Sequence, residues 1–134
     1  LNKKLPIFYD VAHNSAGINT IRLTLKSIDA SKKIGLIVLK EDKNVDSIAK
    51  SLKGLFDELI ISTLPDSQLM GKNQLFNSLK KHSITCSIIY PIEKAFYYIS
   101  VQSTKGAVCV IFGSHYMAKS IYKFFEINFD NVSI

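Results

Sequence analysis

An acid, a histidine and an asparagine lie close together near the start of the chain, directly after a short apolar run. Asp10, His13 and Asn14 fall within Tyr-Asp-Val-Ala-His-Asn-Ser, residues 9–15. A carboxylate at such a point can accept hydrogen bonds from the paired hydroxyls of a ribose, and a neighbouring imidazole can contact a phosphate or a substrate carboxylate. A structural role remains the alternative, because Asn14 or Ser15 could cap a helix and Asp10 could brace the turn.

A second polar cluster follows an apolar run near the other end of the chain, where Gly113, Ser114, His115 and Tyr116 are consecutive. Glycine permits a close approach of the backbone. Ser114 can cap the helix that follows, and the free N–H groups of that helix form a weak anion site. His115 and Tyr116 could add side-chain hydrogen bonds. A cap combined with packing is the structural alternative for this cluster.

The elements that must position these residues alternate along the chain. Amphipathic segments with apolar residues three or four apart predict helices at residues 14–28, 44–56, 72–82, 91–103 and 114–128. Apolar runs predict strands at residues 7–11, 34–39, 58–62, 84–90 and 107–112. Strands that are apolar on both faces indicate a covered sheet, and single intervening helices indicate parallel crossovers. We predict an α/β, Rossmann-like three-layer α/β/α sandwich with a mostly parallel sheet.

The domain organisation follows from the same pattern. We expect residues 1–134 to form a single domain, with a loosely held tail at residues 129–134. Ligands of open parallel sheets bind beyond the carboxyl ends of the strands, so both polar clusters are expected at the ligand edge. The sequence contains no G-x-x-x-x-G-K-[ST] loop, no G-x-G-x-x-G and no G-x-S-x-G. The chain therefore offers substrate-binding residues without a recognisable catalytic centre.

Charge and cysteine content narrow the class of partner. The net charge is +6, carried by 16 lysines and the single arginine Arg22, and the lysines are spread along the chain. A nucleic-acid binder more often clusters its charge and uses arginine, so we expect a general attraction for anionic ligands and no nucleic-acid partner. Cys86 and Cys109 lie in apolar runs, which predicts free thiols in buried strands and a cytoplasmic protein. No cysteine or histidine spacing suggests a metal site, and no apolar run is long enough to span a membrane.

The two clusters together resemble a known family. Residues 10–14 (Asp-Val-Ala-His-Asn) resemble the D-[GV]-A-H-N-P segment that opens the C-terminal domain of folylpolyglutamate and dihydrofolate synthases, within the Mur ligase group. Residues 113–116 (Gly-Ser-His-Tyr) resemble the family's G-S-x-Y segment, and residues 42–44 (Asp-Lys-Asn) resemble its D-K-D. Ser15 replaces the family's proline and Asn44 replaces the second aspartate.

This resemblance implies an ATP-dependent acid–amino-acid ligase. Such enzymes add L-glutamate to dihydropteroate or folate through an acyl phosphate, with ATP and magnesium. The resemblance places the phosphate loop and the magnesium ligands on a preceding N-terminal ATPase domain. The C-terminal domain closes over ATP and glutamate, and we expect it to be inactive in isolation.

The resemblance also implies roles for individual residues. Asp10 would hold the ATP ribose, and His13 would contact nucleotide phosphate or incoming glutamate. Asn14 would mainly cap a helix and could also touch the nucleotide. Ser114 and Tyr116 would help to seat glutamate. No residue of this chain is assigned to catalysis or to a metal.

Two other functions stay open at this point. A muramyl-peptide ligase shares the D-x-A-H-x-P pattern, although the Gly-Ser-His-Tyr segment favours the folate branch. A stand-alone α/β ligand-binding module without a ligase partner is the second alternative.

Overall fold

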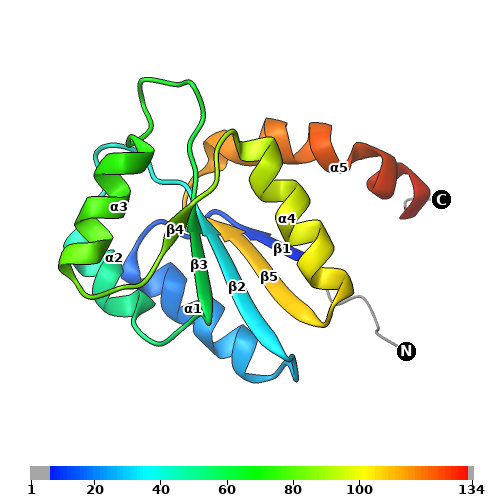
Figure 1. Cartoon of the computed structure of the whole chain (residues 1–134), viewed down its shortest axis with the longest axis horizontal. Coiled ribbons are helices and arrows are strands. Elements are labelled where there is room, and N and C mark those ends of the chain that lie inside the picture. The colour runs from blue at the N-terminus through cyan, green and yellow to red at the C-terminus, as the bar shows by residue number, and fades with distance from the viewer. Residues whose placement is uncertain (1–6, 133–134) are drawn as a thin grey trace.

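A five-stranded parallel sheet forms the centre of the molecule (Figure 1). The structure is a computed structural model that describes residues 7–132, with side chains as far as residue 125. The strand order is β1-β5-β2-β3-β4, and every neighbouring pair within it is parallel. The strands are β1 (Ile7–Asp10), β2 (Lys32–Ile37), β3 (Glu58–Ile61), β4 (Ser87–Ile88) and β5 (Ala107–Phe112).

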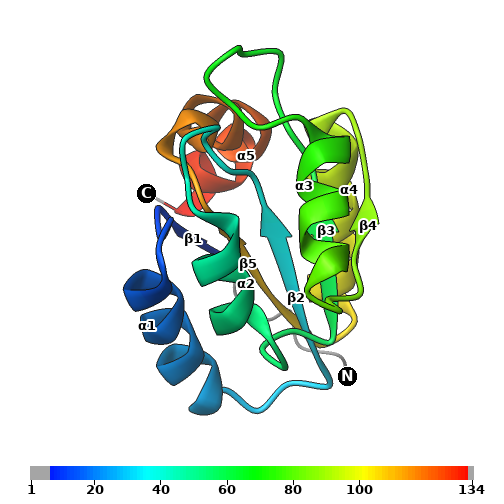
Figure 2. The same cartoon turned by 90° about the vertical axis from the view of Figure 1, so that its left-hand side faces the viewer.

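Helices cover both faces of the sheet (Figures 1 and 2). One face carries α1 (Ser15–Lys26), α2 (Val45–Leu52) and α3 (Lys72–Lys81). The other face carries α4 (Ile92–Thr104) and α5 (Ala118–Val132), and a short 3-10 helix, η1 (His115–Met117), precedes α5. The predicted α/β/α sandwich with a parallel sheet is therefore confirmed.

Two apolar clusters, one on each side of the sheet, form the core. All six residues of β5 are buried, because this strand lies between β1 and β2 and is covered on both faces. On α1 the predicted apolar stripe is buried at Ile18, Ile21 and Leu25. Each fully buried side chain of this size contributes about 1.5–3 kcal/mol.

The fourth strand differs from its prediction. The apolar run at residues 84–90 predicted a buried strand, but β4 has two residues, which are exposed and half-buried. It lies at the edge of the sheet and pairs with β3 on one side, so alternate side chains face solvent. Cys86 precedes β4 and is half-buried, so its placement in a buried strand was wrong. Cys109 is buried in β5 as predicted, and burial, with a smaller effect of Glu58, raises its thiol pKa to about 12.

Helix ends also differ from the sequence-based bounds. α2 ends at Leu52, four residues before its predicted end, and Gly54 follows with a φ of 71°. The last helical segment begins with the η1 turn, and α5 continues to Val132, past its predicted end at residue 128. Residues 133 and 134 lie outside the described residues, so a loose tail at 129–134 stays a prediction.

Candidate functional site

The two predicted clusters meet at one edge of the sheet. β1 and β5 are neighbours, and Asp10 aligns with Phe112 at their carboxyl ends. The chain then turns to opposite faces, because α1 packs on one side of the sheet and α5 on the other. Ligands of open α/β sheets bind at such crossover points. We call the two loops, residues 10–14 and 113–116, the β1–β5 junction.

The first loop is held by its own polar side chains. Asp10 Oδ1 accepts a hydrogen bond from the Ala12 N–H at 2.8 Å, and this contact uses one of its two carboxylate oxygens. Asn14 is the N-cap of α1, and its Oδ1 accepts from the Gly17 N–H at 2.9 Å. The turn-bracing role of Asp10 and the capping role of Asn14 are therefore both present. Neither role excludes a ligand contact.

Bracing the turn and capping α1 explain Asp10 and Asn14, but they give no role to His13. The residue is half-buried, and its Nδ1 atom is buried without a hydrogen-bond partner among the described residues. An unpaired buried polar atom costs about 1–3 kcal/mol, and such atoms in native proteins usually have a ligand or water as partner. Because Nδ1 is closed to solvent, a ligand would meet the exposed part of the His13 ring.

The second loop is fixed by close backbone packing. Gly113 has a φ of 111°, and a Cβ atom at this position would lie 2.3 Å from the carbonyl oxygen of Val38. Both the backbone angle and the contact require glycine. Ser114 is 3% exposed and caps η1, because its Oγ accepts from the Tyr116 N–H at 3.0 Å.

The accessible part of this loop is aromatic. His115 is exposed and Tyr116 is half-buried, and their rings stack with centroids 4.6 Å apart. Ser114, in contrast, is buried. Tyr116 is thus the more accessible of the two residues expected to seat glutamate. Ser114 could offer its hydroxyl proton from its buried position.

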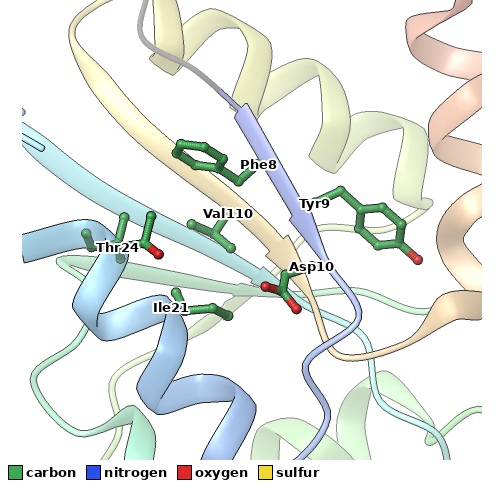
Figure 3. Close-up of a pocket in the computed structure, with 7 residues that line it drawn as sticks. Phe8, Tyr9, Asp10, Ile21, Thr24 and Val110 are labelled. Atoms are coloured by element: carbon green, nitrogen blue, oxygen red, sulfur yellow. The ribbon is translucent and has the colours of Figure 1, made fainter. Parts of the chain in front are cut away.

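Tyr9 joins the two loops and was missed by the sequence reasoning. Its hydroxyl donates a hydrogen bond to the Ser114 carbonyl oxygen at 2.8 Å, across 105 positions of sequence. Burial, with a further contribution from Tyr122, raises the pKa of the Tyr9 phenol, so the hydroxyl stays a donor at neutral pH. The alternation of β1 could have signalled that Tyr9 faces away from Phe8 and Asp10, as Figure 3 shows.

A small pocket lies beside this junction, between β1 and α1 (Figure 3). Its volume is about 110 Å³. Sites for small molecules and cofactors usually exceed about 300 Å³, so this pocket is too small to hold a nucleotide by itself. Its lining is mainly apolar: Phe8, Tyr9, Asp10, Ile21, Thr24, Leu25 and Val110.

The loop after β2 lies next to the β1–β5 junction, since the Val38 N–H donates to the Phe112 carbonyl at 3.2 Å. Asn44, the position that departs from D-K-D, caps α2 by accepting from the Ser47 N–H at 3.2 Å. Asp42 lies 3.8 Å from the ammonium of Lys40. The contacts of these two residues are therefore structural.

The described part of the chain lacks both a metal-binding cluster and a membrane-spanning helix. Among the side chains described, as far as residue 125, no group of three or more histidine, cysteine, aspartate or glutamate residues could hold a metal ion. No helix within residues 7–132 is long and apolar enough to cross a membrane.

Comparison with known proteins identifies the fold. No family model and no curated protein sequence matches the chain. Among solved structures, E. coli FolC in complex with ADP matches with a TM-score of 0.80 and 15% identity over 96% of this chain. Mycobacterium tuberculosis folylpolyglutamate synthase complexed with ADP and AMPPCP matches with a TM-score of 0.77 and 21% identity over 89% of the chain. Thermotoga maritima folylpolyglutamate synthase matches with a TM-score of 0.61 and 27% identity over 79%.

The match covers a part of each of these enzymes. The chain spans 30%, 29% and 24% of the E. coli, M. tuberculosis and T. maritima structures, respectively. It has the fold of one domain of folylpolyglutamate synthases, consistent with their C-terminal domain. The resemblance stated from the two motifs is therefore confirmed at the level of the fold.

Proposed function

We propose that the chain is the C-terminal domain of an ATP-dependent folate ligase that adds L-glutamate to dihydropteroate or folate. The observation that carries this proposal is the meeting of the two family motifs, residues 10–14 and 113–116, at one crossover point. The fold around them is that of enzymes whose solved complexes contain ADP.

The proposed reaction has two steps. The γ-phosphoryl group of ATP passes to the carboxylate of the folate substrate, giving an acyl phosphate and ADP. The amine of glutamate then attacks the activated carbonyl, phosphate leaves, and an amide forms. Magnesium would assist the first step, and we assign its ligands to a preceding domain because the described residues offer no cluster of metal ligands.

The residues of this chain would bind and orient the substrates. Asp10 would accept hydrogen bonds from the ribose through the carboxylate oxygen that does not hold the turn. The exposed part of the His13 imidazole would contact a nucleotide phosphate or the glutamate carboxylate. Ser114 and Tyr116 would seat glutamate, and Asn14 would add a nucleotide contact to its role as helix cap.

Other features are compatible with this proposal. The net charge of +6 favours the approach of ATP, glutamate and folate, which are all anionic. The free thiols of Cys86 and Cys109 suit a reducing compartment, so we place the ligase in the cytoplasm. A muramyl-peptide ligase remains the second candidate within the same reaction class, and the comparisons favour the folate branch.

Substitutions in the intact ligase test the site. We expect Asp10→Asn and His13→Ala each to lower kcat/KM for glutamate ligation about 100-fold, because each removes a contact to a substrate. Asp10→Asn keeps an oxygen that can hold the turn, so the free energy of unfolding should change by less than about 0.5 kcal/mol. Leu23→Ala, at an exposed position of α1, serves as the control with normal activity.

Near-normal kinetics for both site variants would show that the assignment of Asp10 and His13 is wrong.

The isolated chain provides a separate test of the domain assignment. It contains no phosphate loop, so we expect no ATP hydrolysis and no ligation from it. Measurable turnover by the purified chain would instead favour a stand-alone module.

A further inference from the structure

We propose that Tyr9 is a positioning residue that sets the glutamate-seating loop against the nucleotide-binding loop of the β1–β5 junction. This inference rests on the proposed function. Tyr9 touches neither substrate in this scheme, and it acts through the backbone of Ser114.

The position of Tyr9 in β1 makes this role possible. Phe8 packs against the core cluster under α1, whereas Tyr9 packs against the cluster under α4 and α5. Figure 3 shows the ring of Tyr9 pointing away from Phe8 and Asp10. Its hydroxyl reaches the Ser114 carbonyl at 2.8 Å, so one residue of β1 links the first loop directly to the second.

Several contacts hold Ser114 in place. The contact with Tyr9 differs from the others because it comes from β1. Its Oγ is held by the Tyr116 N–H, which belongs to the same loop. Gly113 before it is fixed against Val38, which follows β2. The hydrogen bond from Tyr9 comes from β1, the strand that leads into Asp10 and His13. Together with the β1–β5 ladder, in which Asp10 aligns with Phe112, it sets the spacing of the two loops, while the other contacts hold the second loop itself.

The Tyr9 hydroxyl is a hydrogen-bond donor at neutral pH. Burial raises the pKa of the Tyr9 phenol from an ordinary value near 10, so the group remains protonated at neutral pH.

Tyr9→Phe in the intact ligase separates positioning from packing, because it keeps the ring and removes the hydroxyl. We expect KM for glutamate to rise about fivefold, the factor that matches one typical net hydrogen bond. KM for ATP should change by less than about twofold, because Asp10 remains in β1 and keeps its own turn contact. Hydrogen exchange of the amides at residues 113–117 should accelerate, while exchange in α3 stays unchanged.

Tyr97→Phe is the matched control, since Tyr97 lies on α4 and is 66% exposed. It should leave both KM values and the exchange of residues 113–117 unchanged. A Tyr9→Phe enzyme with the kinetics of Tyr97→Phe would overturn the positioning role and leave the proposed function intact. An equal rise of both KM values would overturn it as well, because general loosening does not discriminate between substrates. An intact wild-type protein that ligates no glutamate would refute the proposed function itself.

Discussion

Three neighbouring strand pairs, β1–β5, β5–β2 and β3–β4, send their following helices to opposite faces of the sheet, and the first and the last of these crossover points are built differently. At the β1–β5 junction the chain continues into α1 and α5, and at the ends of β3 and β4 it continues into α3 and α4. Topology makes both points candidates for ligand binding. The comparison teaches that local chemistry, more than strand order, distinguishes them.

The helix starts show the difference most directly. The helical segments at the β1–β5 junction begin with side-chain caps, from Asn14 and from Ser114. The helices after β3 and β4 begin at Gly71 and Pro91, which provide no side-chain cap. The first pair of loops is thus held in place by its own polar groups.

Unpaired polar atoms also differ between the two points. His13 Nδ1 and Ser62 Oγ are both buried without a hydrogen-bond partner in the described part of the chain. His13 as a residue is half-buried and can meet a ligand, whereas Ser62 is 1% exposed. The exposed part of the His13 ring is therefore compatible with binding, and the Ser62 hydroxyl is a local cost to stability.

The largest expected difference between the two crossover points concerns one glycine at each, Gly113 and Gly71. We expect Gly113→Ala to lower the free energy of unfolding by about 3 kcal/mol or more, from a positive φ and a Cβ placed 2.3 Å from the Val38 carbonyl. Gly71→Ala, at a φ of −61° with no atom within 4 Å of the new Cβ, should be neutral or gain up to about 1 kcal/mol. Urea unfolding of the three proteins measures both values. Similar losses for the two variants would contradict the difference in backbone packing.

Helix capping gives an intermediate effect. Asn14→Ala should cost about 1 kcal/mol, because the Gly17 N–H loses the side-chain acceptor that caps α1. Asn73→Ala, in the first turn of α3, should cost nothing or stabilise slightly, since alanine is the better helix former and α3 has no side-chain cap to lose. Thermal unfolding of both variants provides the measurement. An equal loss at Asn73 would mean that α3 depends on a polar side chain after all.

Two fully buried serines give the smallest expected effect. Ser62→Ala should raise the free energy of unfolding by up to about 1 kcal/mol, because it removes an unpaired hydroxyl from the interior. Ser103→Ala should lower it by about 1 kcal/mol, because the Ser103 hydroxyl donates to the Ser100 carbonyl at 2.9 Å. Chemical unfolding should therefore give shifts of opposite sign. If Ser62→Ala lowered the free energy of unfolding, the Ser62 hydroxyl would have a hydrogen-bond partner. The contrast between Ser62 and His13 would then not hold.

Much of the fold was predictable because it depends on local patterns. The spacing of Ile18, Ile21 and Leu25 fixes the buried stripe of α1, and the apolar run at residues 107–112 fixes the central strand. The apolar run around β4 led to the wrong prediction of a buried strand, and the reason is physical. Its residues have a neighbouring strand on one side, and edge position is a property of the assembled sheet.

The composition of the site was predictable, while its internal contacts were not. The spacing of Asp10 and His13 and the Gly-Ser-His-Tyr segment located both loops from the sequence. The hydrogen bond from Tyr9 joins residues 105 positions apart, so local periodicity could not reveal it. The depth of Ser114 and the unpaired Nδ1 of His13 likewise depend on which strands become neighbours.

The position of β5 between β1 and β2 has a consequence for the order of events on the ribosome. Among the strands of this sheet β1 comes first in the sequence, and its partner in the sheet, β5, comes last. Strands β2, β3 and β4 can pair earlier, because each follows its neighbour in the chain. The β1–β5 junction therefore forms only after all the other strands of this sheet have been synthesised, when β5 enters the sheet and Tyr9 meets Ser114.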